Sequence, residues 1–260
     1  MSTATVLRGE VRCARKVMLR DPAAVFFTVG LPLLYLFIFG TVFKGTATVR
    51  GLPGGFKTSV YVVASVIVIS VVSAAFQNLT AQLVYDRENG VLKRLRSTPV
   101  RTSAFLAGPV INATVASALL AVLVAALGRL AFGVSLPAGH LLAAAVTVII
   151  GALSFCALGC LFTVVIHKAS AAMPMVAAVT LTLFFLSGSF FTTDTAPAAL
   201  RTVASVFPVR HFLVAMLTAY DPHVASAGFA FRDLGIIALW GATAAVLAAR
   251  SFRWTPVGER

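Results

Sequence analysis

The 260-residue chain contains little charge, and most of that charge is positive. Charged residues make up 11% of the sequence, with eight Asp and Glu against 21 Lys and Arg. A water-soluble domain needs far more charge to cover its surface, so the composition excludes an ordinary soluble fold. Because 59% of the residues are hydrophobic, we expect the chain to face lipid over most of its exterior.

Several other features are scarce or missing. The three cysteines, Cys13, Cys156 and Cys160, give an odd count with no disulfide framework. Cys156 and Cys160 lie four residues apart in an apolar run without His, Asp or Glu beside them, which favours helix packing over a metal site. The first 20 residues have no apolar core or cleavage pattern typical of a signal peptide.

The net charge of +13 has two readings, nucleic-acid binding or attraction to an anionic membrane surface. No stretch is long or polar enough to form a folded basic surface with interleaved aromatics, so we expect no nucleic-acid partner. The cytoplasmic face of a membrane is the expected partner for this charge.

Long apolar runs dominate what is present, and each is close to the roughly 20 residues that cross a bilayer as a helix. Backbone groups in lipid must bond internally, and the alternation of a barrel strand is absent, so we expect an all-α membrane protein with six transmembrane helices. Residues 1–260 are expected to form a single transmembrane domain. The predicted spans are 23–43, 58–80, 102–128, 140–166, 171–191 and 233–249.

The basic residues predict the orientation. With six spans, the segments on the side of both termini carry 14 Lys and Arg, and those on the other side carry 7. This excess places both termini in the cytoplasm.

Residues 194–220, between the last two predicted spans, are too apolar for a solvated loop and too broken for a span. Asp194 to Pro197 is typical of a helix start, and Pro208 interrupts the segment before an apolar run to Tyr220. We expect two short helices that re-enter the outer leaflet, with protein covering their backbone.

Residues 1–20 combine an apolar stripe with an adjoining basic arc at helical spacing. The pattern indicates a helix lying in the membrane interface, which we favour over a purely topogenic basic tail. The stripe is Leu7, Val11, Ala14 and Met18, and the arc is Arg8, Arg12, Arg15 and Lys16.

The most charged segment is 84–98, between the second and third spans. Asn89-Gly90 permits a break in helix geometry and Pro99 closes the segment. Val91, Leu92 and Leu95 would form an apolar patch on a short amphipathic helix able to receive force from a partner. A solvated positive-inside loop explains the same residues equally well.

The sequence from Glu88 to Pro99, ENGVLKRLRSTP, resembles the cytoplasmic signature of the type-2 ABC exporter permeases, especially the daunorubicin-resistance-permease-like members. It departs from that signature at Val91, where a Thr or Ser is usual. The basic N-terminal helix, the six spans, and the run Leu186 to Phe191 followed by Pro197 and Pro208 also resemble that family in order.

This resemblance implies an ATP-driven exporter of a bacterial plasma membrane, with no catalysis by this chain. Two copies of a separate ATPase subunit would hold ATP and Mg, consistent with the absence of a G-x-x-x-x-G-K-[ST] loop here. A second permease copy, identical or a close paralogue, would complete the pathway. The cargo would be hydrophobic or amphiphilic, such as a drug, antibiotic, lipid or glycoconjugate, as in multidrug efflux and antibiotic resistance.

The resemblance also implies which residues couple the permease to the ATPase. They are Glu88, Gly90, Leu92, Lys93, Arg94, Leu95 and Arg96.

Polar and aromatic residues within the spans have two readings. Gln77, Asn78, Asn112 and Phe185 could line a pathway, but hydrogen bonding between helices and ordinary packing explain the same residues.

Two rival functions have weaker support. An ion-coupled secondary transporter is disfavoured because no charged residue lies in the middle of a predicted span. An intramembrane hydrolase would need Ser189 to meet one of the four His residues, all of which are predicted at membrane edges or in loops.

Overall fold

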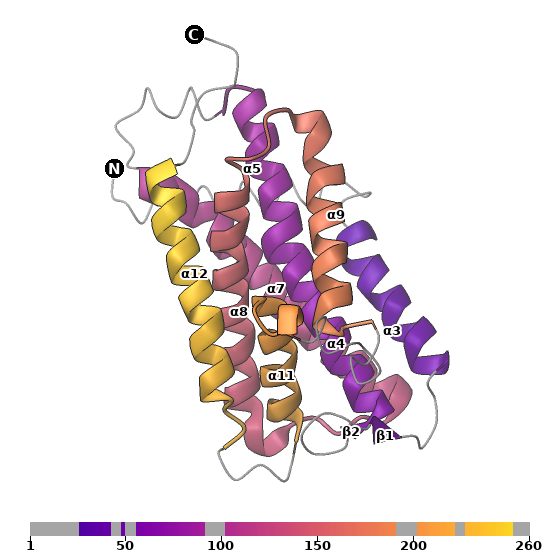
Figure 1. The fold of residues 1–260 in the computed structure, drawn as a ribbon. Helices are drawn as coiled ribbons and strands as arrows, with labels where there is room; N and C mark the ends of the chain where they lie inside the picture. The colour runs from indigo at the N-terminus through magenta and orange to yellow at the C-terminus, as the bar shows by residue number, and fades with distance from the viewer. Residues whose placement is uncertain are drawn as a thin grey trace.

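A computed structural model describes residues 26–42, 48–49, 56–91, 102–190, 202–221 and 227–251. These residues form a bundle of helices with one very short pair of strands (Figure 1). The first helix comprises η1 (Phe26–Gly30) and α3 (Leu31–Val42); a second comprises α4 (Thr58–Val72), η2 (Ser73–Asn78) and α5 (Leu79–Glu88). The others are α7 (Thr102–Phe132), η3 (Ala138–His140), α8 (Leu141–Phe162), α9 (Ala169–Ser187), α11 (Pro208–Tyr220) and α12 (Phe231–Ser251).

Five of the described helices are long and apolar enough to cross a membrane, which supports a multi-pass membrane protein. They are Thr58–Glu88, Leu106–Phe132, Leu141–Phe162, Ala169–Ser187 and Phe231–Ser251. The predicted first span corresponds to a shorter apolar helix, Thr28–Val42. The prediction of six spans is therefore matched by five full-length helices and one shorter helix among the described residues.

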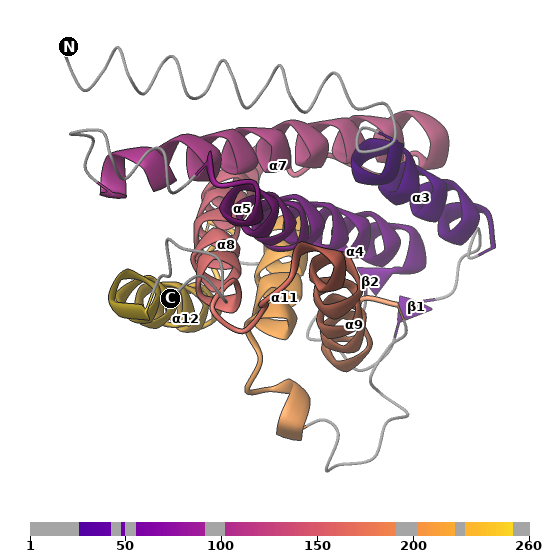
Figure 2. The ribbon, with the colours of Figure 1, turned by 90° about the horizontal axis from the view of Figure 1, so that it is seen from above.

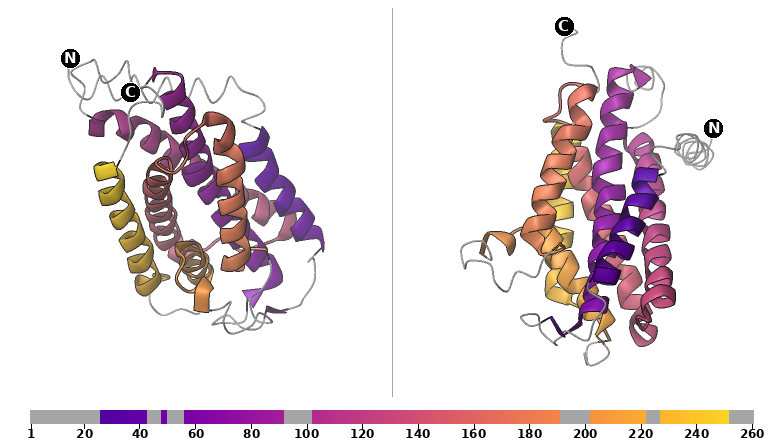
Figure 3. Two further views of the ribbon diagram at one scale, coloured as in Figure 1. Left: turned by 45° about the horizontal axis from the view of Figure 1, so that its top comes forward. Right: turned by 90° about the vertical axis from the view of Figure 1, so that its right-hand side faces the viewer.

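The helix Thr58–Glu88 is the centre of the bundle. Every residue from Tyr61 to Val72 is buried, and the helix lies between α3 and α7 on one side and α9 on the other (Figures 2 and 3). Its sequence explains this position, because the run Val60–Val72 is hydrophobic or small on all faces. A π-helical stretch, η2, widens the helix at Ser73–Asn78 without ending it.

Small residues allow the closest helix contacts. A Cβ on Gly241 of α12 would lie 2.8 Å from the Cα of Ser154 in α8, and one on Gly151 of α8 would lie 2.7 Å from the ring of Phe212 in α11. Close backbone approach of this kind supplies packing energy between helices in lipid, where the hydrophobic effect does not. These glycines therefore fix the positions of α8, α11 and α12.

The two ends of the bundle differ. We call the end that holds Glu88, Ala169 and Ser251 the junction end, and the opposite end, with the strands and the connection between α7 and α8, the hairpin end (Figure 1). At the hairpin end β1 (Thr48–Val49) pairs antiparallel with β2 (Phe56–Lys57). The predicted all-α fold did not include this pair of strands, which lies between the first two predicted spans.

Helix α11 occupies the half of the bundle nearer the hairpin end (Figure 1). Pro208, predicted as an interruption, is the first residue of this helix, a position that its fixed φ and missing N–H suit. Ten of its 13 residues are buried, against α4, α8, α9 and α12. The predicted N-terminal helix 1–20, residues 92–101, and residues 191–201, where the first of the two predicted re-entrant helices would begin, lie outside the described residues. Thr202 to Ala204, which precede Pro208, are helical.

Candidate functional site

The last turn of α5 reaches the connection between α8 and α9 at the junction end. Arg87 is only 3% exposed, and its Nη1 donates a hydrogen bond of 3.0 Å to the carbonyl oxygen of Thr163. Its Nη2 donates to the carbonyl oxygen of Ile166. Thr163 caps the C-terminus of α8, where unpaired carbonyls and the helix dipole favour a cation. Arg87 thus supplies from α5 the donors that the end of α8 lacks.

The next residue, Glu88, contacts the other end of the same connection. Its Oε2 accepts a hydrogen bond from the backbone N–H of Ala169, the first residue of α9. Lys168, at the N-cap of α9, forms no side-chain capping bond, so Glu88 takes the place of the missing cap. A carboxylate at a helix N-terminus is also favoured by the helix dipole. We call Arg87, Glu88 and the connection 163–169 the Arg87–Glu88 junction.

Gly90 ends α5 and turns the chain away from it. Its φ is +70°, in the left-handed region, and its N–H donates to the carbonyl oxygen of Arg87 at 3.2 Å. A Cβ at this position would meet no atom within 4 Å, so backbone conformation alone favours glycine here. The predicted break at Asn89-Gly90 is therefore present, and it separates Glu88 from the predicted coupling residues Leu92 to Arg96.

The predicted helix 84–98 is not continuous in the structure, because the chain turns at Gly90. Residues 84–88 form the last turn of α5, because nothing between Asn78 and Glu88 interrupts helical geometry. Val91 is the last described residue before the gap and is 38% exposed. Leu92, Lys93, Arg94, Leu95 and Arg96 lie outside the described residues, as do Arg8, Arg12, Arg15 and Lys16.

The predicted pathway residues occupy separate helices. Asn78 donates a hydrogen bond of 2.9 Å from Nδ2 to Oγ1 of Thr28, which joins η2 to η1 and matches the interhelical reading. Gln77 and Asn112 are half-buried on η2 and α7. Phe185 is 52% exposed on α9, with its ring centroid 5.2 Å from that of Phe190.

The arrangement of Ser189 and His211 does not support the hydrolase alternative. The Ser189 hydroxyl lies 2.7 Å from that of Ser187, and no described contact joins Ser189 to a histidine. His211 bonds through Nδ1 to Asp233 at 2.6 Å and through Nε2 to the carbonyl oxygen of Ser205 at 2.8 Å. Both ring nitrogens are therefore engaged in holding α11 to α12 and to the turn at Ser205.

Sequence reasoning missed Arg87, which it counted only as one of the basic residues that orient the chain. The available signal was an Arg-Glu pair one turn from a helix-ending glycine, which matches the two opposite charges needed at adjoining helix ends. Among the described residues, no group of three or more His, Cys, Asp or Glu could hold a metal ion.

Comparison with known protein families identifies the family of this chain. A family profile described as ABC-2 type transporter matches residues 10–220, which is most of the chain. The chain belongs to the ABC-2 type transporter family. It is therefore a membrane subunit of an ABC transporter, and subunits of this family normally pair with an ATPase subunit. No curated protein matches the chain.

The match covers both elements of the site. It includes α5, with Arg87 and Glu88, and the connection between α8 and α9 that they contact. It extends to Tyr220 and so also includes α11. The Arg87–Glu88 junction accordingly lies within the ABC-2 transporter domain.

Proposed function

We propose that this chain is the permease subunit of an ATP-driven exporter, and that the segment after Gly90 receives force from a separate ATPase subunit. In this proposal the ATPase, in two copies, binds ATP and Mg, and two permease copies, identical or closely related, enclose the pathway. The chain would lie in a bacterial plasma membrane with both termini and the junction end in the cytoplasm. Its cargo would be hydrophobic or amphiphilic.

The Arg87–Glu88 junction is the observation that carries the coupling proposal. Adjacent side chains of α5 bind the end of α8 and the start of α9, only a few residues before the proposed coupling segment. Arg87 is buried, so its bonds are shielded from water, and hydrogen bonds from a charged donor to a neutral acceptor contribute about 1.5–3 kcal/mol each. A displacement of residues 92–96 would therefore move α5, α8 and α9 together.

The positions of the ionisable residues in the described helices favour an exporter over an ion-coupled transporter. Arg87 is buried, but it lies at a helix end and binds carbonyls, and the described Asp and Glu residues lie at or near helix ends. His211 and Asp233 form an ionisable pair within the bundle, but both ring nitrogens of His211 are already bonded, and a proton relay would need a chain of such residues across the membrane.

The experiment compares two glycines with similar positive φ values at opposite ends of the bundle. Gly90 and Gly133 have φ values of +70° and +63°, and a Cβ on either would meet no atom within 4 Å. A valine at each should therefore cost similar stability, about 1 kcal/mol or more, because a β-branched residue tolerates a left-handed φ poorly. Only Gly90→Val alters the link to the coupling segment.

The permease, copurified with its ATPase and reconstituted in nanodiscs, would carry spin labels at the exposed Lys57 and Phe231 of the hairpin end. We expect ATP and Mg to change the distance between these labels in the parent protein and in Gly133→Val. In Gly90→Val and in Glu88→Ala, ATP hydrolysis should continue while the distance change is lost. An undiminished distance change in Gly90→Val would overturn the coupling assignment.

A further inference from the structure

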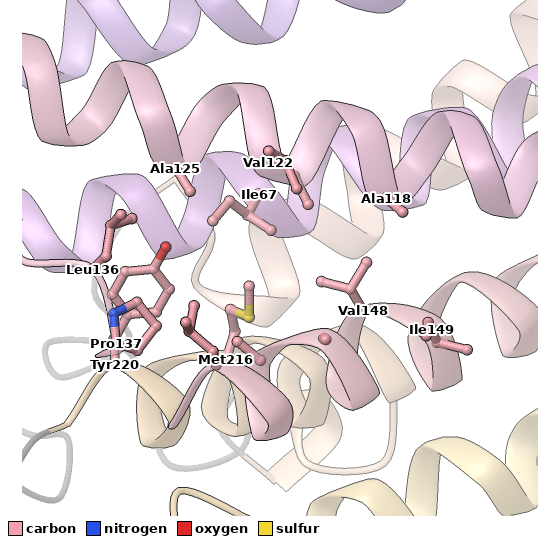
Figure 4. Close-up of a pocket in the computed structure, with 14 residues that line it drawn as sticks. Ile67, Ala118, Val122, Ala125, Leu136, Pro137, Val148, Ile149, Met216 and Tyr220 are labelled. Carbon is pink, nitrogen blue, oxygen red and sulfur yellow. The ribbon is translucent and has the colours of Figure 1, made fainter. Parts of the chain in front are cut away.

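An apolar cavity of about 200 Å³ opens between α7 and α8 in the half of the bundle nearer the hairpin end. Ala118 to Ala125 of α7 form one wall, and Leu141 to Ile149 of α8 form the other (Figure 4). Ile67 of α4 and Met216 of α11 lie at the back of the cavity. It is larger than the ~150 Å³ apolar cavity that accommodates a benzene molecule in an engineered protein.

The mouth of the cavity lies on a surface made of large aliphatic side chains. Val122 of α7 is 67% exposed, and Leu141 and Ile149 of α8 are 57% and 46% exposed. The exposed face of α7 continues this character with Val115 and Leu119. The α7–α8 wall therefore has the composition of a surface that faces lipid.

Hydrocarbon is the medium that such a wall meets in a membrane. A ligand that came from water would have to lose its hydration shell to enter this apolar cavity. An acyl chain of a lipid beside the wall has no hydration shell and can enter without that cost. An empty cavity, by contrast, costs its lining the dispersion contacts that a chain would supply. Occupation by a neighbouring chain is accordingly favoured over a void.

The single polar side chain of the lining lies at one end of the cavity. Tyr220, beside Leu136 and Pro137 at the hairpin end, is buried, and its hydroxyl points into the cavity (Figure 4). The deeper part, around Ala118, Val148 and Met216, has no polar side chain. The cavity therefore has a polar end near the interface and an apolar end toward the middle of the bilayer. A membrane lipid has the same arrangement, with its ester groups near the interface and its chains toward the middle.

We infer that this cavity is a binding site for one acyl chain of a phospholipid from the leaflet at the hairpin end, with the Tyr220 hydroxyl available to the ester carbonyl. The inference does not depend on the exporter proposal, since it uses only the membrane setting and the cavity. The bound chain would fill the space between α7, α8 and α11, and so support the position of α11 against α8.

The test uses nanodiscs of phosphatidylcholine containing a phosphatidylcholine with a mid-chain diazirine, followed by irradiation and peptide mass spectrometry. Met216 is the informative residue, because it lines the cavity but is only 2% exposed. Lipid that merely coats the surface would label Val122 and Leu142, which are exposed, and leave Met216 unlabelled. We expect labelled Met216 peptides.

Two neighbouring alanines of α7 give a matched pair of variants. Ala125 lines the cavity, whereas Ala126 is exposed and outside its lining. Ala125→Phe should abolish labelling of Met216, and Ala126→Phe should leave it unchanged; both should keep surface labelling at Leu142, which shows that the bundle is intact. The inference is overturned if Met216 stays unlabelled in the parent protein or if Ala125→Phe has no effect. It is also overturned if an Ala145→Cys variant forms disulfide-linked dimers through this face, which would assign the cavity mouth to a second copy.

Discussion

Replacing Arg87 with methionine should destabilise the junction end of the bundle while preserving most of its packing. Methionine keeps the length of the arginine stem but removes both donors, so the carbonyl oxygens of Thr163 and Ile166 lose the bonds that Arg87 makes. The side chain is 3% exposed, so water cannot easily replace the lost donors.

The magnitude follows from two opposing effects. Two hydrogen bonds from a charged donor contribute about 3–6 kcal/mol together, and the favourable dipole of α8 adds up to ~2 kcal/mol. Removing the guanidinium also releases the cost of burying an ion, which is several kcal/mol. We expect a net loss of about 2–4 kcal/mol, which is typical of breaking a buried polar network and would lower Tm by roughly 5–15 °C in a chain of this size.

The assay is thermal unfolding of the purified permease in nanodiscs, followed by circular dichroism. Arg250→Met is the matched control, because Arg250 lies at the same end of the bundle, on α12, but is exposed. That variant should change the free energy of unfolding by no more than about 0.5 kcal/mol. Arg87→Lys, which keeps the charge but loses the planar fork, should fall between the two. An Arg87→Met protein as stable as Arg250→Met would refute the role assigned to the Arg87–Glu88 junction.

Two further predictions concern the packing of the helices. Gly241→Ala should lower Tm measurably, because its Cβ would lie 2.8 Å from the Cα of Ser154. A Cβ on Gly235 of the same helix would meet no atom within 4 Å, so Gly235→Ala should be neutral or stabilising by about 0.5–1 kcal/mol. Equal Tm values for these two variants would contradict the close contact of α12 with α8. Asn78→Leu should lower the free energy of unfolding by about 0.6 kcal/mol, because its hydrogen bond to Thr28 is lost. In a double-mutant cycle, adding Thr28→Val to Asn78→Leu should lower the free energy of unfolding little further.

The spans could be predicted because a helix that crosses lipid must be long and apolar, and both properties are local. The central position of Thr58–Glu88 was harder to foresee, since the other spans are almost as apolar and differ mainly in which faces touch protein. Local sequence also predicted the turn at Gly90, because a positive φ strongly favours glycine.

The contacts that define the site could not be predicted in the same way. Arg87 meets residues 76 and 79 positions later in the chain, and His211 meets Asp233 across 22 positions. The neighbouring Glu88 and Gly90 mark the end of α5, but they do not show that Arg87 is buried, because its burial depends on where α8 ends and α9 begins. The cavity likewise depends on the separation of α7 and α8, which their similar apolar sequences do not reveal.

Site-specific cross-linking from the proposed coupling segment is the most direct test of the account. A photo-cross-linking amino acid at Leu95 would be compared with one at Leu136, at the hairpin end, in cells that express the permease with its ATPase. We expect an adduct between the Leu95 variant and a subunit that binds and hydrolyses ATP, and none from Leu136. No adduct at Leu95 in a complex that still hydrolyses ATP, or an equal adduct from Leu136, would contradict the coupling assignment.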